Sequence, residues 1–376
     1  MNLKVNVIMK NILITGVGGP TPRSFVRAVK LTEHSANKQY RFVGVDCNPL
    51  AYGLYDNSLF DQRYVVPRSN SDEYWPAMNQ LIRKENIDAA IVLPEEEVLE
   101  WSLNHQSKLN RPVITHLPDH RLAKSLVNKH QMHEQLADSS LIPKFIKINP
   151  LSYNYQSIVN EIGDTFWIRS TEGSSGLGSL KIDSEEALSQ WISINPKVKE
   201  FIATEYLPGR NMACKMLYFD DGLKRTACAE RVNYIMAKVA PSGITGNTSF
   251  GRLINEPELV KLSKQALEII ASQLACELNG IFTVDYKEDS EGFPKITEIN
   301  VRHVAFTSSM AAGGANIPLD TIKAMISGKG AAMDRVDYTY GESLIFLRDV
   351  DAEPIIMKES DLLKDNSMLQ ESISNR

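Results

Sequence analysis

Acidic and amide side chains gather in one stretch of the sequence, residues 280–302. Two runs of alternating apolar and polar residues flank a segment rich in turn formers, which predicts a β-hairpin. Glu298, Asn300 and Arg302 are two residues apart and would share one face of the second strand, because alternate side chains point the same way. The turn places Asp285 about opposite Glu298, where two carboxylates repel each other unless a cation holds them.

Magnesium is the cation that best suits this set of oxygen ligands. It is a hard ion that binds carboxylates, waters and substrate phosphates together. Arg302 on the same face then suits the charge that develops on a transferring phosphoryl group. The alternative is a half-exposed strand with solvated charges, since antiparallel strands commonly alternate in this way.

Length and composition indicate a globular protein with more than one domain. The chain has 376 residues, 43% hydrophobic and 23% charged, which is enough for two or three domains with sizeable cores. Its net charge of −5 predicts no general attraction to nucleic acid or to anionic membranes. No apolar run is long enough to span a bilayer, and the first residues lack a signal-peptide pattern, with Met9 as a second candidate start. Four scattered cysteines fit a reducing compartment, so we expect a cytoplasmic protein.

The first region, up to about residue 118, alternates strand and helix patterns. This order predicts a Rossmann-like parallel sheet with helices on both faces. Glycines after the first strand, with Asp46 after the second, suggest a nicotinamide dinucleotide site as an alternative. The loop lacks the G-x-G-x-x-G spacing and Asp46 lies too far along the chain, so this alternative is disfavoured. The strand candidates are 11–15, 42–46, 64–66, 89–93 and 113–115, and the helix candidates are 23–31, 71–84 and 96–104.

A loop rich in glycine and serine lies between two strands within residues 166–182. It lacks the Lys-Ser/Thr pair and the following helix of a Walker A motif. Such a hairpin tip can instead fold over a triphosphate, with backbone N–H groups and hydroxyls as donors and Arg169 supplying charge. A mobile hairpin without a ligand is the alternative. Around this loop we expect a helix at 119–137, strands at 201–205, 212–219 and 225–232, and a helix at 258–278.

Four features follow one another in an informative order: Asn128-Lys129, the strand-borne Arg169 with its Gly/Ser loop, Glu205 to Gly209, and Asp285 with Glu298-Ile-Asn300-Val-Arg302. In this order the chain resembles the ATP-grasp superfamily, in particular the ATP-binding modules of the carbamoyl-phosphate synthase large chain and related carboxylate-amine ligases. The resemblance implies an α/β and α+β protein. It divides the chain into a Rossmann-like pre-ATP-grasp domain at 10–118, a two-lobed ATP-grasp domain at 119–330 and a C-terminal extension at 331–376.

The resemblance also implies roles for individual residues. Asp285, Glu298 and Asn300 look like the Mg²⁺ ligands. Arg302 looks like the residue that stabilises the transferred phosphoryl group, and Arg231 lies where relatives have a residue near the acyl phosphate. The positions that would bind ATP are Lys129, Arg169, Ser174, Ser175, Gly176, Gly178, Glu205, Tyr206, Leu207 and Asn211.

Three positions depart from the family pattern. Asn211 stands where a glutamate often holds the ribose, and Lys215 stands where many relatives have an acid. His303 follows the E-I-N-x-R motif, where small residues are usual; it is either a specialisation of this chain or a partly exposed histidine at a strand end. Lys215 and Arg231, with Glu97 from the acidic run after the fourth strand, are our candidates for the substrate pocket.

The implied reaction is amide bond formation through an acyl phosphate. ATP and Mg²⁺ are the expected cofactors, a small carboxylate and an amine are the substrates, and a homodimer is the expected assembly. Two alternatives stay open: an NAD(P)-binding oxidoreductase built on the first domain, and a nucleotide-binding regulatory protein without catalysis. Intact Asp285, Glu298, Asn300 and Arg302 argue against the second.

Overall fold

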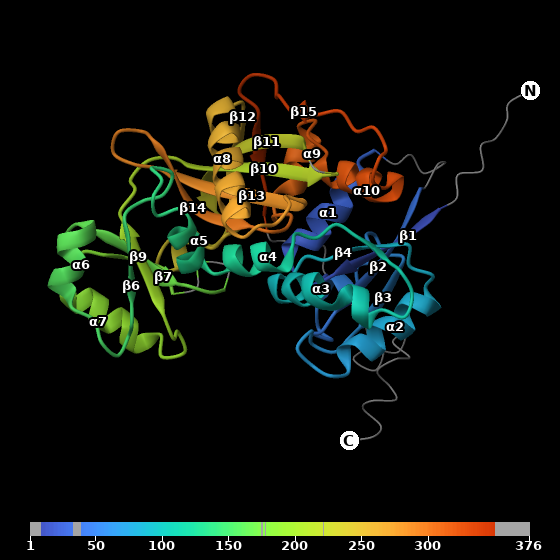
Figure 1. Ribbon diagram of the computed structural model, residues 1–376, viewed down its shortest axis with the longest axis horizontal. Coiled ribbons are helices and arrows are strands. Elements are labelled where there is room, and N and C mark those ends of the chain that lie inside the picture. Colours follow the sequence, from blue (N-terminus) through green and yellow to red (C-terminus); the bar gives the residue numbers. More distant parts are fainter. Residues whose placement is uncertain (1–8, 33–38, 174–175, 177, 221, 350–376) are drawn as a thin grey trace, which may run out of the picture.

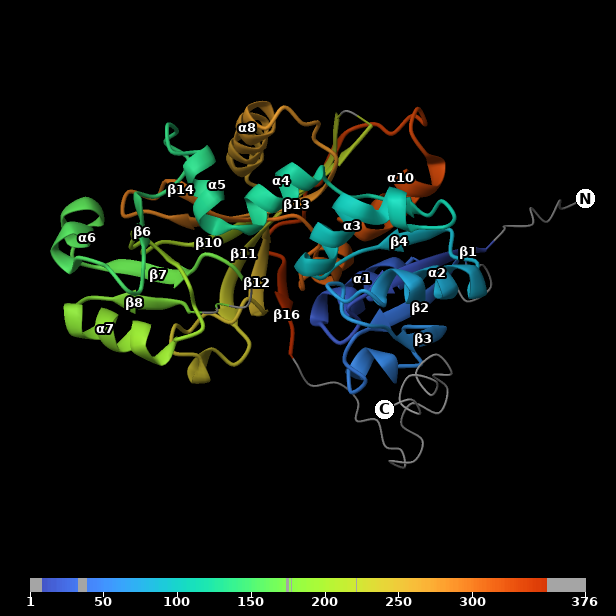
Figure 2. The ribbon, with the colours of Figure 1, turned by 60° about the horizontal axis from the view of Figure 1, so that its bottom comes forward.

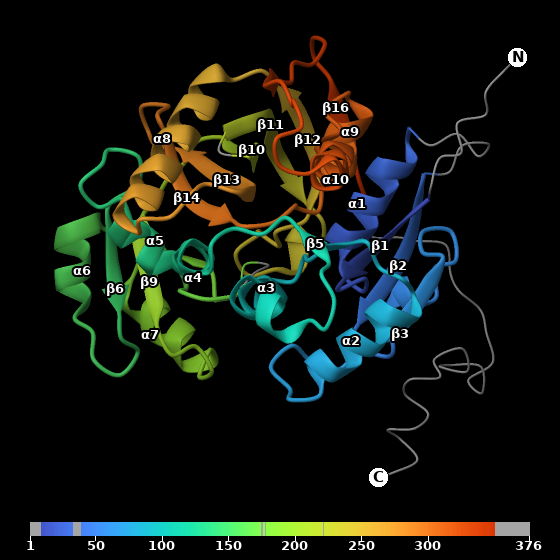
Figure 3. The same cartoon turned by 45° about the vertical axis from the view of Figure 1, so that its right-hand side comes forward.

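The chain forms three β-sheets that follow one another along the sequence. The computed structural model describes residues 9–32, 39–173, 176, 178–220 and 222–349. A five-stranded sheet and a four-stranded sheet lie at opposite ends of the molecule, and a seven-stranded sheet lies between them (Figure 1). The same order is seen from another side in Figure 3.

The first sheet is parallel, with strand order β3-β2-β1-β4-β5, as predicted. Its central strand has a residue pattern suited to burial on both faces. Ile12 and Ile14 pack toward α1, whereas Leu13 packs toward α2 and α3. The elements are β1 (Lys10–Thr15), α1 (Pro20–Lys30), β2 (Tyr40–Asp46), η1 (Tyr52–Leu54), β3 (Gln62–Val65), α2 (Tyr74–Lys84), β4 (Ala89–Ile91), α3 (Glu95–Lys108) and β5 (Ile114–Thr115).

The single helix predicted at 119–137 is wrong: two helices occupy this segment. They are α4 (His120–Val127) and α5 (Lys129–Gln135). Asn128 separates them because its backbone is extended, and its side chain accepts a hydrogen bond from the backbone N–H of Gln131. An asparagine in this position caps the helix that follows it. The break therefore places Lys129 at the first residue of α5.

The four-stranded sheet is antiparallel, with strand order β6-β9-β7-β8. Its helices cover one face, where Ile158 and Leu188 pack against Phe166 and Phe201. The expected hairpin that ends in the Gly/Ser loop is confirmed by the pairing of β7 with β8. The elements are β6 (Phe145–Ile148), α6 (Tyr155–Ile162), β7 (Phe166–Ser170), β8 (Leu180–Ile182), α7 (Glu185–Ile194) and β9 (Phe201–Glu205).

The largest sheet has the order β14-β13-β10-β11-β12-β16, with β15 beside β11. One face packs against α8, and the other packs against α9 and α10. The predicted strands at 212–219 and 225–232 are confirmed. The elements are β10 (Asn211–Phe219), β11 (Gly222–Tyr234), η2 (Ala237–Val239), β12 (Thr248–Ile254), α8 (Pro257–Gln273), β13 (Gly280–Glu288), β14 (Pro294–Asn300), α9 (Thr307–Ala312), α10 (Ile317–Ser327), β15 (Val336–Asp337) and β16 (Ile345–Leu347).

Helix α8 ends five residues before the predicted end at residue 278. Ala275 has a left-handed backbone with φ of 49°, which stops the helix. The N–H of Cys276 then donates to the carbonyl of Ala271, as in a common helix-ending motif. In the described segments, no helix combines the length and the apolar character needed to cross a membrane. The domain boundaries near residues 118 and 330 stay a prediction.

Candidate active site

The hairpin of β13 and β14 brings the two expected carboxylates together. Asp285 is paired with Glu298 across the two strands, as predicted. Ile299 and Val301 are buried on the opposite face. We expected Arg302 to lie within the second strand of the hairpin. Strand β14 instead ends at Asn300, so Arg302 lies two residues beyond it.

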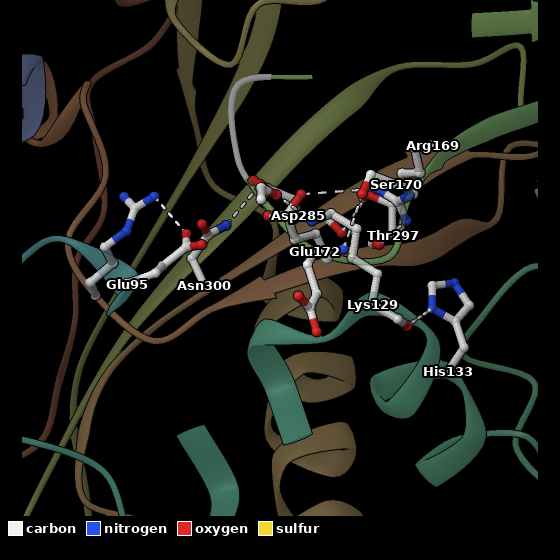
Figure 4. Close-up of polar contacts among 12 residues, drawn as sticks. Glu95, Lys129, His133, Arg169, Ser170, Glu172, Asp285, Thr297 and Asn300 are labelled. Carbon is white, nitrogen blue, oxygen red and sulfur yellow. Dashed lines mark hydrogen bonds and ion pairs between the residues drawn. The ribbon is translucent and has the colours of Figure 1, made fainter. Parts of the chain in front are cut away.

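Glu298 lies between two basic side chains from different parts of the chain, Lys129 and Arg169. Figure 4 shows these two basic residues beside Thr297 and Asp285. Oε1 of Glu298 is 4.0 Å from Nζ of Lys129, and its Oε2 is 3.9 Å from Nη1 of Arg169. Lys129 also donates to the carbonyl of Gly173 at 2.7 Å, and Arg169 donates to the carbonyl of Thr297. These bonds to backbone hold both cations beside the carboxylate without neutralising them.

Charge decides the protonation of Glu298. Burial on its own would raise the pKa of this carboxyl, but the nearby charges of Lys129, Arg169 and Arg302 hold its pKa below the usual range. Glu298 is therefore ionised at neutral pH. Arg169 is affected in the opposite way, because burial lowers its pKa more than the acids raise it.

Asp285 faces a different cation. Its Oδ1 is 3.3 Å from Nη1 of Arg231, and its Oδ2 accepts from the amide nitrogen of Asn300 at 3.2 Å. Burial raises the pKa of Asp285 to about 6; Arg231 opposes this increase, while the charge of Glu298 adds to it. Two facing carboxylates of which one has a raised pKa are an arrangement that a bound cation would stabilise.

Arg302 is held by the first domain. Its Nη2 donates to Oε1 of Glu95 at 2.8 Å, and its Nη1 donates to the carbonyl of His303 at 3.1 Å. Glu95 is the first residue of α3, in the acidic run that the sequence analysis singled out. Within that run our pocket candidate was Glu97, whose carboxylate instead accepts a hydrogen bond from the hydroxyl of Tyr74 at 2.8 Å.

Solved ligases share this arrangement of sheets. N5-carboxyaminoimidazole synthetase from Staphylococcus aureus, solved with ADP, has a TM-score of 0.63 over 91% of this chain and 81% of that chain, at 16% identity. The L-amino acid ligase from Bacillus licheniformis has a TM-score of 0.61 over 84% of this chain and 74% of that chain, at 14% identity. D-alanine–D-alanine ligase from Bacillus anthracis has a TM-score of 0.54, with coverages of 85% and 97% and 14% identity. The chain has the ATP-grasp fold. No protein-family model matches the sequence, and no curated protein sequence matches it significantly.

The Gly/Ser hairpin contains four of the candidate ATP-binding residues, two of which the structure describes. Gly176 and Gly178 both have left-handed backbones, with φ of 76° and 64°. A Cβ at Gly176 would lie 2.5 Å from the carbonyl oxygen of Ile244, so the hairpin closely approaches the loop between β11 and β12. Ser174 and Ser175, the other two candidates in this hairpin, lie outside the described residues.

The remaining ATP candidates lie where β9 meets β10. Glu205 accepts a hydrogen bond from the backbone N–H of Lys144 at 3.0 Å, so its side chain holds β6 beside β9. Tyr206 is partly exposed and Leu207 is buried, and Asn211 begins β10. No described contact joins these side chains to Glu298 or Asp285. Their predicted roles in binding ATP stay predictions.

Two of the departures from the ATP-grasp pattern are buried. Lys215 is 1% exposed and its ammonium donates to the hydroxyl of Thr307. His303 is 2% exposed and packs edge-on against Phe25, with ring centroids 4.8 Å apart. The expectation of a partly exposed histidine is therefore wrong, because α1 covers this position. Burial lowers the pKa of both groups well below their ordinary values.

Asp46 does not have the geometry of a ribose ligand. Its Oδ2 accepts from the N–H of Gly18 at 2.7 Å and its Oδ1 from the N–H of Asn48 at 2.8 Å. The carboxylate therefore fastens the glycine loop to the end of β2. Together with the ATP-grasp fold, this arrangement removes the support for an oxidoreductase.

Sequence reasoning missed the backbone acceptors and the partners from remote segments. The carbonyls of Gly173 and Thr297 have no signal in the sequence, since every residue offers a carbonyl. The pairing of Glu95 with Arg302 joins residues 207 positions apart. Only the position of Glu95, just after a strand of a parallel sheet, could have indicated it.

Proposed function

We propose that the protein is an ATP-dependent carboxylate-amine ligase that forms an amide bond through an acyl phosphate. The observation that supports this most is the pair of facing carboxylates: Glu298 lies beside the buried Arg169, and Asp285 lies beside the partly buried Arg231. The fold supports it as well, because the similar structures include ligases that act on amino acids and a synthetase solved with ADP. ATP is the proposed cosubstrate.

Magnesium fits the residues present. Asp285, Glu298 and the amide oxygen of Asn300 offer only oxygen ligands, which Mg²⁺ prefers. Burial, and then the charge of Glu298, raise the pKa of Asp285, and a cation beside the two carboxylates would oppose both effects. When bound, Mg²⁺ would neutralise charge on the phosphates of ATP.

Cations on both sides of the hairpin would position the reactants. Lys129 and Arg169 would bind the ATP phosphates, and Arg302 would stabilise the charge on the transferring phosphoryl group. A substrate carboxylate oxygen attacks the γ-phosphorus, and the bond from that phosphorus to ADP breaks. The amine then attacks the carbonyl carbon of the acyl phosphate, the C–N bond forms and inorganic phosphate leaves with the C–O bonding electrons. The amine nitrogen loses one proton, which the released phosphate takes up. Arg231 is the proposed contact of the acyl phosphate.

The first test changes one carboxylate to its amide. We expect Glu298→Gln to lower ADP release by about 100-fold or more, because the variant loses the negative charge that faces Lys129 and Arg169 and one proposed metal ligand. Glu258→Gln, at an exposed position of α8 where Glu258 pairs with Lys261, is the matched control and should keep full activity. An unchanged rate in Glu298→Gln with intact folding would refute the site.

The second test identifies the reaction. ADP release with Mg²⁺-ATP is measured over a panel of carboxylic acids and amines, alone and in pairs. Release that needs both partners supports the ligase. Tight ATP binding without release under any pair would favour a regulatory protein that binds nucleotide without catalysis.

A further inference from the structure

Four arginines from separate parts of the chain surround the start of α9. Arg23 and Arg27 lie one turn apart on α1, Arg231 lies on β11, and Arg348 directly follows β16. We call this set the arginine cluster. Only Arg231 was a candidate site residue from the sequence. The other three belong to no motif that they share with it.

Arg231 and Arg348 meet at one buried residue. The hydroxyl of Thr248 accepts a hydrogen bond from Nε of Arg231 at 3.1 Å, and its carbonyl accepts from Nη1 of Arg348 at 3.0 Å. The guanidinium of Arg231 also lies over the ring of Phe306, 5.7 Å from its centroid. Phe306 stacks on Phe346, which is two residues before Arg348. These contacts fix the two guanidinium groups beside each other at the end of the large sheet.

Helix α1 brings the other two arginines to the same place. The hydroxyl of Ser24 donates to that of Ser308 in α9 at 2.8 Å, and accepts from the N–H of the same residue at 2.9 Å. Arg23 and Arg27 flank this docked position, and β16 descends beside α1 in Figure 2. The cluster therefore lies where the first sheet and the large sheet face each other.

The cluster has almost no negative charge of its own. Arg231 pairs with Asp285, but within the described residues no carboxylate forms an ion pair with Arg23, Arg27 or Arg348. Burial, followed by the charges of Arg27, Arg231 and Arg23, lowers the pKa of Arg348 to about 10. Guanidinium groups that repel one another in this way are stabilised when an anion binds among them.

Other groups around the cluster do not supply that anion. Arg23 lies over the ring of Tyr52, 5.0 Å from its centroid, and donates to the carbonyl of Gly19 at 3.2 Å. Asp56 attracts Arg23 from a distance, but its Oδ1 already accepts from Ser58. The first turn of α1 contains no acidic residue, so it adds no negative charge to the cluster.

We propose that the arginine cluster binds a second anionic group, a phosphate or a carboxylate, on the same substrate whose carboxylate is activated. This inference rests on the proposed function and names its substrate class: a polyanionic acid. Arg231 links the facing carboxylates to the rest of the arginine cluster, because it contacts Asp285 and shares Thr248 with Arg348. The ATP phosphates are assigned elsewhere, to Lys129 and Arg169 beside Glu298.

Guanidinium groups suit this role better than lysines would. Their planar N–H groups form paired hydrogen bonds to the oxygens of carboxylate or phosphate. Loss of one charge-assisted contact commonly weakens binding about 10-fold to 100-fold. Arg27 and Arg348 are the positions to change, because neither contacts the facing carboxylates.

The test compares matched acids in the ADP-release assay. The panel contains alanine, aspartate, glutamate and O-phosphoserine, each with and without an amine partner. We expect turnover with an acid that has a second anion, and in Arg348→Gln we expect KM for that acid to rise at least about 10-fold with kcat nearly unchanged. Aspartate or glutamate as the better substrate would identify a carboxylate, and O-phosphoserine would identify a phosphate. Arg335→Gln, on the exposed surface and paired with Asp337, is the control and should match the wild type.

A binding measurement separates this inference from the proposed function. Calorimetry with inorganic phosphate and with malonate, without ATP, should show binding to the wild type that weakens at least about 10-fold in Arg27→Gln. Arg27 is exposed, so this variant tests the cluster even if Arg348→Gln does not fold. If the variant weakens anion binding but no acid is turned over, the proposed ligase activity is refuted and the anion-binding role of the arginine cluster is supported. If alanine is the preferred substrate and KM is unchanged in both variants, the anion-binding role of the arginine cluster is refuted and the proposed ligase activity is supported.

Discussion

The charge state of His133 makes the free energy of unfolding depend on pH. His133 is fully buried on α5, and its Nδ1 lies 2.7 Å from the carbonyl oxygen of Lys129. A carbonyl only accepts, so Nδ1 carries the proton, and within the described structure the buried Nε2 has no hydrogen-bond partner. Burial, with the charge of Arg169, lowers the pKa of His133 from 6.5 to about 3.

The sign and the size of the effect follow from this difference in pKa. Below pH 6.5 the unfolded chain binds a proton at His133 that the folded chain does not bind. Its contribution to stability is therefore complete above pH 6.5 and is lost as the pH falls toward about 3. The loss is about 2 kcal/mol at pH 5 and about 5 kcal/mol once both states are protonated.

The assay compares urea unfolding of the wild type and His133→Asn at about pH 7.5 and about pH 5. Asparagine places an amide N–H near the position of Nδ1, so the hydrogen bond to Lys129 can be kept. The variant is expected to be less stable at the higher pH, because it loses ring packing against Phe145. Between the two pH values the wild type should lose about 2 kcal/mol more than the variant. Equal losses in both proteins would refute the assignment of His133 as a buried neutral group.

Three further changes test other parts of the structure. Glu95→Gln should lower kcat for ADP release about tenfold with little change in KM for ATP, because Arg302 loses the charge that orients it; an unchanged kcat would contradict this. Lys215→Met should raise the free energy of unfolding by about 1–2 kcal/mol, since it removes a buried ammonium that has no carboxylate partner among the residues that the structure describes; a loss of stability in urea would show that the ammonium is favourable. Gly53→Ala should cost more than about 2 kcal/mol, because a Cβ would lie 2.1 Å from the carbonyl oxygen of Val17; an unchanged melting temperature would contradict the close approach.

The hairpin at the centre of the site was predictable because its signals are local. Alternation with period two fixes which side chains share a face, and the turn residues fix the register within a residue or so. Asp285 and Glu298 are indeed paired. The five parallel strands were predictable for a related reason, since each is a short apolar run between turn residues.

The misplaced helix ends depend on single residues that lack a strong signal. Asn128 interrupts the helical pattern by capping α5, yet asparagine is only mildly unfavourable inside a helix. Ala275 adopts a left-handed backbone that alanine rarely has, so nothing in its type predicted the end of α8. Tertiary contacts decided both positions.

The contacts that complete the site could not be read from the sequence, because they join segments far apart. Glu298 is balanced by cations from α5 and β7, whereas Asp285 is balanced by Arg231 from β11. The hairpin thus separates two groups of positive charge, one beside the Gly/Ser loop and one beside α1 and β16. In the proposed reaction, two reactants that both carry negative charge, ATP and an acid, must approach the same pair of carboxylates. Separate cationic surfaces on either side of those carboxylates allow each reactant to bind without displacing the other.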